Sequence, residues 1–264
     1  MRGWRSRLGR RLRSERRRLA GRSYVVLVYH RFAGELKPGQ ERIDIAPRRF
    51  ARQLRALRLV GFRAISPEEI VAFHDGSLEA VPKRGIAITV DDAIEDCVEP
   101  LRRHADWQPQ LFVPTAELGG SADWIDSEPV ASWEQVAELA AAGVRIGSHT
   151  RHHRRLTSLG EEERKDELAG SLAELRARLP GALDLLAYPN GDHDDAVCAA
   201  AHVAGYAAAY TTEKGRNEAG TDRYRLGRVS VHGADGALAV LWKAWTGQGL
   251  PPLWLRLRGL LGRS

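Results

Sequence analysis

The chain has 264 residues, of which 43% are hydrophobic and 28% charged, as in a globular protein large enough for a full core. Its net charge of +6 is unevenly distributed, because residues 1–22 hold ten arginines and one acid, which leaves the remainder mildly acidic. That balance excludes a generally basic domain, so we expect no nucleic-acid partner.

Residues 1–22 form a basic arm, the first segment in chain order. Its apolar residues recur near helical spacing: Trp4, Leu8, Leu12 and Leu19. The pattern is typical either of an amphipathic helix on an anionic membrane surface or of a solvated tail. The arm lacks the apolar segment of a signal peptide, and we expect no transmembrane helix. With only two, widely separated cysteines, the chain is expected in the reducing cytoplasm, free or at the inner face of the membrane.

Residues 23–247 alternate predicted strands with predicted helices. Strands are predicted at residues 23–29, 62–65, 85–90, 111–114, 144–146, 184–187, 206–210 and 226–231. Helices are predicted to begin at Pro47 and Pro67 and to cover residues 95–104, 133–142, 161–179 and 194–204. Such alternation is typical of βαβ units around a parallel sheet, and seven or eight units predict one irregular (β/α)7-8 barrel.

A second basic amphipathic segment, residues 248–264, follows the predicted barrel. Leucines, Trp254 and arginines alternate in it, so it is predicted either to bind the same membrane surface as the arm or to pack on the barrel.

Chemically active side chains follow several predicted strands. In chain order they are His30, Asp91, Asp92, His149, His153, the run Tyr188, Pro189, Asn190 and Gly191, and finally His232. Because the carboxyl ends of parallel strands meet at one mouth, we expect these positions to converge there.

His149 and His153 are four residues apart, a spacing that puts two imidazoles on one side of a helical turn. Together with one carboxylate of the pair Asp91 and Asp92 they make a two-histidine, one-carboxylate set with open positions. Adjacent strand residues point to opposite sides, so the second carboxylate is available for a proton. Zinc is the expected occupant, with cobalt, nickel or manganese as alternatives. In the other interpretation, the aspartates only cap a helix and residues 152–155 form a solvated basic turn.

Taken together, these motifs resemble those of the polysaccharide deacetylase, or NodB-homology, family (carbohydrate esterase family 4). TVDDA at residues 89–93 resembles its first motif, HTRHH at 149–153 its second and YPNG at 188–191 its third. VYHRF and LGRVSV are similar to segments of the members that begin with a Tyr-His strand. The resemblance covers about residues 24–231 and implies a deformed TIM barrel that removes acetyl groups from N-acetylated sugars.

The resemblance also implies roles for individual residues. Asp92, His149 and His153 would bind a divalent metal, and Asp91 would be the general base. The segment Tyr188, Pro189, Asn190 and Gly191 would contact substrate, with a backbone amide near Asn190 holding the oxyanion.

Two assignments remain open within that resemblance. His30 is the first choice for the acid that protonates the departing amine, and His232 is the second. Many members orient the catalytic aspartate with an arginine where this chain has Ala187, so we expect Arg228 to take that part.

The leading hypothesis is a metal-dependent hydrolase that removes an N-acetyl group from an amino sugar. The expected cytoplasmic setting favours a glycoconjugate precursor, either lipid- or nucleotide-linked, over a finished polysaccharide. The alternatives are a deacylase or deformylase of another small or lipid-linked amide, and an inactive barrel that binds sugar without cleaving it.

Overall fold

The computed structural model describes residues 20–33 and 43–251. The two basic amphipathic segments predicted at the ends therefore lie largely outside the described residues, as do residues 34–42. Within the described part of the chain, no helix is both long and apolar enough to cross a membrane.

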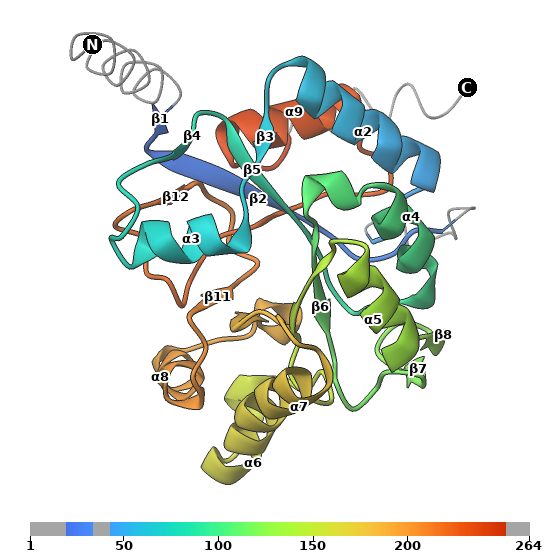
Figure 1. Ribbon diagram of the computed structural model, residues 1–264, viewed down its shortest axis with the longest axis vertical. Helices are drawn as coiled ribbons and strands as arrows, with labels where there is room; N and C mark the ends of the chain where they lie inside the picture. Colours follow the sequence, from blue (N-terminus) through green and yellow to red (C-terminus); the bar gives the residue numbers. More distant parts are fainter. Residues whose placement is uncertain (1–19, 34–42, 252–264) are drawn as a thin grey trace, which may run out of the picture.

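A curled, mainly parallel sheet forms the centre of the molecule (Figure 1). Its strands, in chain order, are β2 (Ser23–Tyr29), β5 (Gly85–Val90), β6 (Gln110–Val113), β9 (Arg145–Ser148), β10 (Leu185–Ala187), β11 (Ala208–Tyr210) and β13 (Val229–Ser230). In space they follow the order β11-β10-β9-β6-β5-β2, with β13 on the other side of β2.

The sheet curls because the segment that enters β13 contacts both of its edges. Leu226 forms a parallel bridge with Tyr210 of β11, and three residues later Val229 pairs with Leu27 of β2. Of the strand predicted over residues 226–231, only Val229–Ser230 is a regular strand. Its first residue, Leu226, pairs instead with β11 at the other edge of the sheet. The prediction of an α/β fold built as an irregular barrel is confirmed.

Several two-residue strands complete the structure. β3 (Arg63–Ala64) pairs with β5, and β12 (Asn217–Glu218) runs antiparallel to β2. β1 (Ala20–Gly21) pairs with β4 (Val81–Pro82), and β7 (Ser121–Ala122) pairs with β8 (Glu128–Pro129). Except for β3, these strands were not predicted, because two residues are too few to show a period-2 pattern.

The helices surround the sheet, with bounds close to those predicted. They are α2 (Pro47–Leu59), α3 (Pro67–His74), α4 (Val98–Arg103), α5 (Trp133–Ala141), α6 (Glu161–Lys165), α7 (Ser171–Arg178), α8 (Asp195–Ala204) and α9 (Ala237–Thr246), with 3-10 turns at Glu95–Cys97, Ala105–Trp107, Leu156–Ser158 and Pro189–Gly191. Reciprocal capping boxes at Ser66 with Glu69 and at Ser132 with Gln135 begin α3 and α5. Helix α9 was not predicted; it lies beside α2 over β2 (Figure 1).

The helix predicted over residues 161–179 is divided. A π-helical turn, Asp166–Gly170, separates α6 from α7 and buries Glu167 and Leu168. A π-turn commonly marks a functional position, because it redirects one side chain without ending the helix.

Candidate active site

The carboxyl ends of β2, β5 and β9 meet at one mouth of the curled sheet. Tyr24, Val26 and Ala87 point into the interior cluster of the barrel, so His30 and Asp91, in the same phase on β2 and β5, also face inward. They line a hollow of about 210 Å³. Its full lining is His30, Ile43, Asp91, Asp92, Trp124, Ile125, His149, His153, Asn190 and Thr212. Six of the positions expected to converge therefore line one hollow, namely His30, Asp91, Asp92, His149, His153 and Asn190, whereas Tyr188, Pro189, Gly191 and His232 do not.

Asp92, His149 and His153 form a group of potential metal ligands. Their ligand atoms all lie within 4.8 Å of one another. The Nε2 atoms of His149 and His153 are 3.5 and 3.2 Å from Oδ1 of Asp92, and all three side chains are buried. Among the described residues, no other group of three such side chains has this spacing.

Hydrogen bonding orients His149 toward this centre. Its Nδ1 lies 2.7 Å from the carbonyl oxygen of Ala187, which can only accept, so Nδ1 carries the proton and Nε2 is available to a metal. The donor set of two imidazole nitrogens and one carboxylate oxygen fits a divalent cation such as zinc.

The charges of the centre support one another electrostatically. Burial alone would raise the pKa of Asp92, but its contacts with His149 and His153 hold it well below its usual range. Burial alone would lower the pKa of His149, but the carboxylates of Asp91 and Asp92 outweigh this and raise it. For His153 burial outweighs the contact with Asp92, so its pKa is lowered, which favours the neutral imidazole that a metal requires.

The second motif is not helical, although its four-residue spacing suggested a helical turn. Thr150 and His153 have φ values of +67° and +55°, in the left-handed region. Buried Glu167 holds this loop, because its carboxylate accepts hydrogen bonds from the backbone N–H groups of Arg151 and His152 and from Nδ1 of His152. His152 is therefore not part of a merely solvated turn, and no sequence pattern pointed to Glu167 as the residue that holds it.

The aspartate turn also has unusual backbone geometry. Asp92 and Ala93 have φ values of +71° and +53°, and Ala93 is fully buried. Non-glycine residues in this region are strained, and such strain is concentrated at functional sites. The turn is what brings Asp92 toward the histidines while Asp91 faces the barrel interior.

Asp91 is paired with Arg228, the arginine expected to orient it. The guanidinium donates two hydrogen bonds of 2.7 Å, one to each carboxylate oxygen, and the arginine side chain is completely buried. Arg228 is itself held by Nε donating to the carbonyl of Thr211. Burial alone would raise the pKa of Asp91, but Arg228 and then His149 lower it below its usual range. The carboxylate is thus kept ionised.

The third motif contributes one residue to the lining. Asn190 lines the hollow, with φ +58°, whereas Tyr188 and Pro189 are buried beneath it. The Tyr188 hydroxyl donates to the carbonyl of Tyr224, 3.1 Å away. A Cβ at Gly191 would lie 2.1 Å from Oγ1 of Thr212, so the turn requires glycine.

Trp124 and Thr212 also line the hollow. Neither was placed among the site residues from the sequence. The indole Nε1 of Trp124 donates to Oδ1 of Asp92 at 3.0 Å, and its ring stacks on His153 with centroids 4.3 Å apart. Because Trp124 comes from the loop between β7 and β8, no local pattern linked it to the aspartates.

The two histidines considered for the acid differ in position. Half-buried His30 lines the hollow together with Asp91 and Asp92, whereas His232 is not among the lining residues. The backbone N–H of His232 donates to Oδ2 of Asp235 at 2.7 Å.

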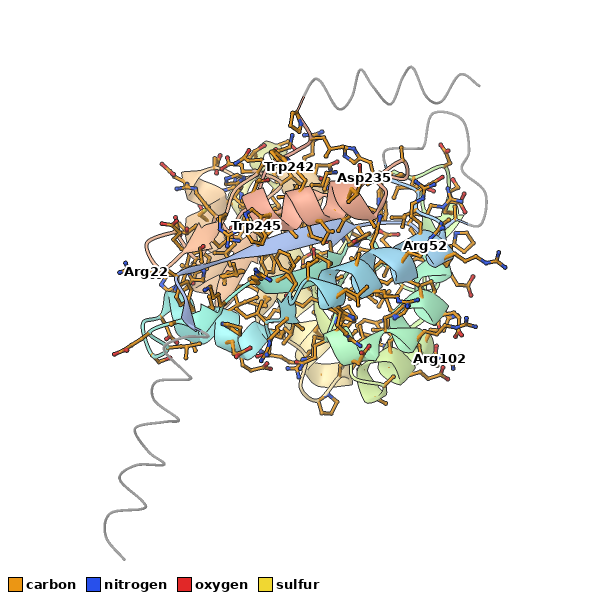
Figure 2. All side chains as sticks on the ribbon, turned by 90° about the horizontal axis from the view of Figure 1, so that it is seen from above. Arg22, Arg52, Arg102, Asp235, Trp242 and Trp245 are labelled. Carbon is orange, nitrogen blue, oxygen red and sulfur yellow. The ribbon has the colours of Figure 1, made fainter. Side chains whose placement is uncertain are left out.

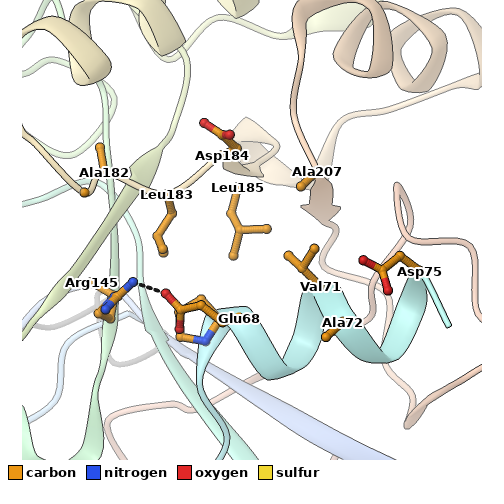
Figure 3. Close-up of a pocket in the computed structure, with 12 residues that line it drawn as sticks. Glu68, Val71, Ala72, Asp75, Arg145, Ala182, Leu183, Asp184, Leu185 and Ala207 are labelled. Carbon is orange, nitrogen blue, oxygen red and sulfur yellow. Dashed lines mark hydrogen bonds and ion pairs between the residues drawn. The ribbon is translucent and has the colours of Figure 1, made fainter. Parts of the chain in front are cut away.

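A larger hollow, of about 510 Å³, lies at the opposite end of the sheet. It is between α3 and the first residues of β9 and β10, and an ion pair of Arg145 with Glu68 borders it (Figure 3). Val71, Leu183 and Leu185 give it mainly apolar walls. Size therefore does not mark the functional site here; the grouping of ligands and titratable side chains does.

Known proteins show similarity to this chain in sequence and in fold. Residues 79–209 match the sequence model of the family described as polysaccharide deacetylase. YxkH of Bacillus subtilis (strain 168), named as a candidate polysaccharide deacetylase, is 23% identical over 211 residues, which are 78% of this chain and 70% of YxkH.

Two solved structures share the fold over most of the chain. IcaB from Ammonifex degensii has a TM-score of 0.72 at 25% identity, covering 88% of this chain and 99% of IcaB. The Streptococcus pyogenes deacetylase PplD, solved in complex with acetate, has a TM-score of 0.71 at 20% identity, covering 83% of this chain and 97% of PplD.

Proposed function

Because this chain belongs to the polysaccharide deacetylase family, we propose that it is a metal-dependent hydrolase that removes N-acetyl groups from amino sugars. The observation that carries the proposal is the position of ionised Asp91, held by Arg228, beside the group of Asp92, His149 and His153. A binding protein has no need of both a metal centre and a separate oriented carboxylate.

A divalent cation held by Asp92, His149 and His153 would act as a Lewis acid toward the acetamide carbonyl and would acidify water. Asp91 accepts the proton of the attacking water, since carboxylate lone pairs remain beyond those that Arg228 occupies. The backbone amide at Asn190 supports the tetrahedral oxyanion. His30 then donates a proton to the sugar nitrogen as the carbon–nitrogen bond breaks, and the free amine and acetate leave.

The size of the hollow favours a short acyl group. The hollow of about 210 Å³, whose lining includes Trp124, Asn190 and Thr212, is large enough for an acetamido group and too small to enclose a fatty acyl chain. The substrate is proposed to be an N-acetylated polysaccharide or a lipid- or nucleotide-linked precursor of one.

Acetate release from N-acetylglucosamine oligomers, measured with and without added zinc or cobalt, tests the proposal. We expect metal-dependent release of acetate and of free amine in equal amounts. Release of formate from N-formyl sugars without release of acetate would favour the deformylase alternative. Sugar binding without release of either product would show an inactive barrel.

Replacing Arg228 is expected to change the pH dependence of the reaction. In Arg228→Gln, burial raises the pKa of Asp91 without the opposing guanidinium, so the base becomes protonated at a higher pH. The acidic limb of the kcat/KM profile should therefore move to higher pH, with partial recovery in Arg228→Lys. Arg225→Gln, at a half-exposed arginine paired with Asp195, is the matched control and should leave the limb in place. An unmoved limb in Arg228→Gln would mean that Asp91 is not the titrating base.

Trp124→Phe is expected to weaken metal binding while leaving the fold intact. The substitution keeps a ring over His153 but removes the N–H that orients Asp92. Loss of such an outer hydrogen bond lowers metal affinity by roughly 10–100-fold. Competition with a fluorescent zinc chelator measures the change. Trp133→Phe is the control, because that ring packs against Arg178, and equal affinities for both variants would contradict the prediction.

A further inference from the structure

A cationic groove lies at the end of the barrel opposite to the catalytic mouth. It has a volume of about 570 Å³ and lies beside the first residues of β2 and β5. The lining residues that carry the argument are Arg22, Lys83, Arg84, Arg216, Phe62 and Trp245. None of the described residues that line it is acidic, and Glu218 is the acidic group that acts on Arg216.

We call this cationic groove the basal groove. Its cations are either bound to neighbouring groups of the protein or exposed to solvent. Arg216 donates from Nε to Oγ of Ser23 at 2.9 Å and from Nη1 to the carbonyl of Trp245 at 2.8 Å. The Arg84 guanidinium lies 5.0 Å from the centre of the Trp245 ring and also bonds the carbonyl of Val60. Arg22 and Lys83 are exposed.

Apolar side chains are exposed next to these cations. Trp245 is 58% exposed, and its ring contacts Phe62 edge to face at 6.4 Å. At the adjacent end of α2, Leu59 is 77% exposed and Val60 38%. Figure 2 shows Trp245 on α9 toward the end of the molecule where Arg22 projects, far from Arg52 on α2. Tryptophan and leucine beside arginine and lysine are typical of the membrane–water interface.

Two segments near the ends of the described chain, β1 and the turn after α9, lie at or next to this groove. Gly21 of β1 lines it, and Gly247, just after α9, approaches Gly215 and Arg216. The sequences that continue from these ends add nine arginines in residues 1–19 and three in residues 252–264. Within the described residues, the groove itself gathers four cations, although the chain after residue 22 is mildly acidic.

We propose that the basal groove is a docking surface for an anionic phospholipid bilayer. Lipid phosphates occupy the groove between Arg22, Lys83, Arg84 and Arg216, and Trp245 and Leu59 enter the headgroup region. Each cation near an anionic bilayer contributes about fivefold to partitioning, and the affinity falls with added salt.

Docking at this end determines where a substrate must be presented. The seven residues of β2 lead from the groove to His30, at about 3.3 Å each, so the catalytic mouth lies roughly 20 Å from the headgroups. An acetamido sugar joined directly to a lipid phosphate of the same bilayer would not reach it. The substrate must therefore extend from the membrane by several sugar units or be soluble. This conclusion about the substrate rests on the proposed function, whereas the docking itself does not.

Flotation of the full chain with phosphatidylcholine vesicles, with and without phosphatidylglycerol, tests the docking. We expect flotation only with the anionic lipid, and a fall in partitioning of at least about 25-fold in Arg22→Glu/Lys83→Glu. The control Arg48→Glu/Arg52→Glu makes the same charge change in the first half of α2, and should bind like the wild type. Equal binding by the wild type and the groove variant would place any contact in the terminal segments and overturn the proposal.

Quenching by brominated phosphatidylglycerol gives an independent readout. Trp133→Phe should lose at least as large a fraction of its tryptophan fluorescence as the wild type, and Trp245→Phe a smaller fraction. Equal quenching in Trp245→Phe would contradict the proposal. So would displacement of the protein from vesicles by low concentrations of inorganic phosphate, which would indicate a site for a free anion. Acetate release from soluble oligomers by Arg22→Glu/Lys83→Glu should be unchanged, which separates this test from that of the proposed function.

Discussion

Asp91→Asn is expected to lower kcat by roughly 10²–10⁴-fold while the protein still binds its metal. The amide is isosteric with the carboxylate but cannot take a proton from the attacking water. Asp91 is not among the three proposed ligands, so the metal content should stay at the wild-type level. Acetate release and elemental analysis on the same sample measure the two quantities.

Loss of stability must be separated from loss of the base in this experiment. Asp91→Asn leaves the buried Arg228 guanidinium without its carboxylate, which costs about 3–5 kcal/mol of unfolding free energy. The double variant Asp91→Asn/Arg228→Met removes both charges, and should recover part of that stability while remaining inactive. Recovery of activity together with stability would mean that Asp91 serves the fold and not the reaction.

His30→Ala is expected to lower kcat by roughly 10²–10⁴-fold, and His232→Ala to change it little. His30 lines the hollow with both aspartates, so it is placed to protonate the departing amine. His232 is not among the lining residues, although its backbone is anchored to Asp235. The two variants are a matched pair, since each removes one imidazole within two residues of the end of a strand.

A substrate with a better leaving group shows whether His30 acts as the acid or only binds the substrate. An acetanilide-type substrate with an electron-withdrawing ring needs less protonation, so His30→Ala should lose less activity on it than on an acetamido sugar. A strong loss in His232→Ala with near wild-type activity in His30→Ala would reverse the assignment.

The buried strands and the residues that follow them were predictable because the signal is local. The runs SYVVLVY and GIAITV are apolar without interruption, as expected for strands covered on both faces, and each leads directly into a polar residue of the site. The pairing of Arg228 with Asp91 was also predictable, since the resemblance left that aspartate without an arginine at position 187. His149 and His153 lie together beside Asp92, as their spacing suggested, but on a loop with positive φ angles and not on a helical turn.

The parts that could not be predicted depend on contacts distant in sequence. Trp124 reaches Asp92 across 32 residues from a loop flanked by two-residue strands, and Glu167 reaches the second motif from a π-turn. Neither position carries a periodic pattern. Helix α9 lacks a side-chain cap at Gly236 and combines buried Val240 with exposed Leu238, so its boundaries are weak in sequence. The two terminal amphipathic segments remain predictions, because they lie largely outside the described residues.

Metal content is the most direct test of the central claim that Asp92, His149 and His153 form the metal centre of a hydrolase. The full chain, purified and equilibrated with zinc, is compared with Asp92→Ala/His149→Ala by elemental analysis after removal of free metal. We predict about one divalent ion per chain in the wild type, its loss in the variant, and acetate release only by the metal-loaded protein. A folded wild type that retains no zinc or cobalt, or a variant that retains as much as the wild type, would contradict the account.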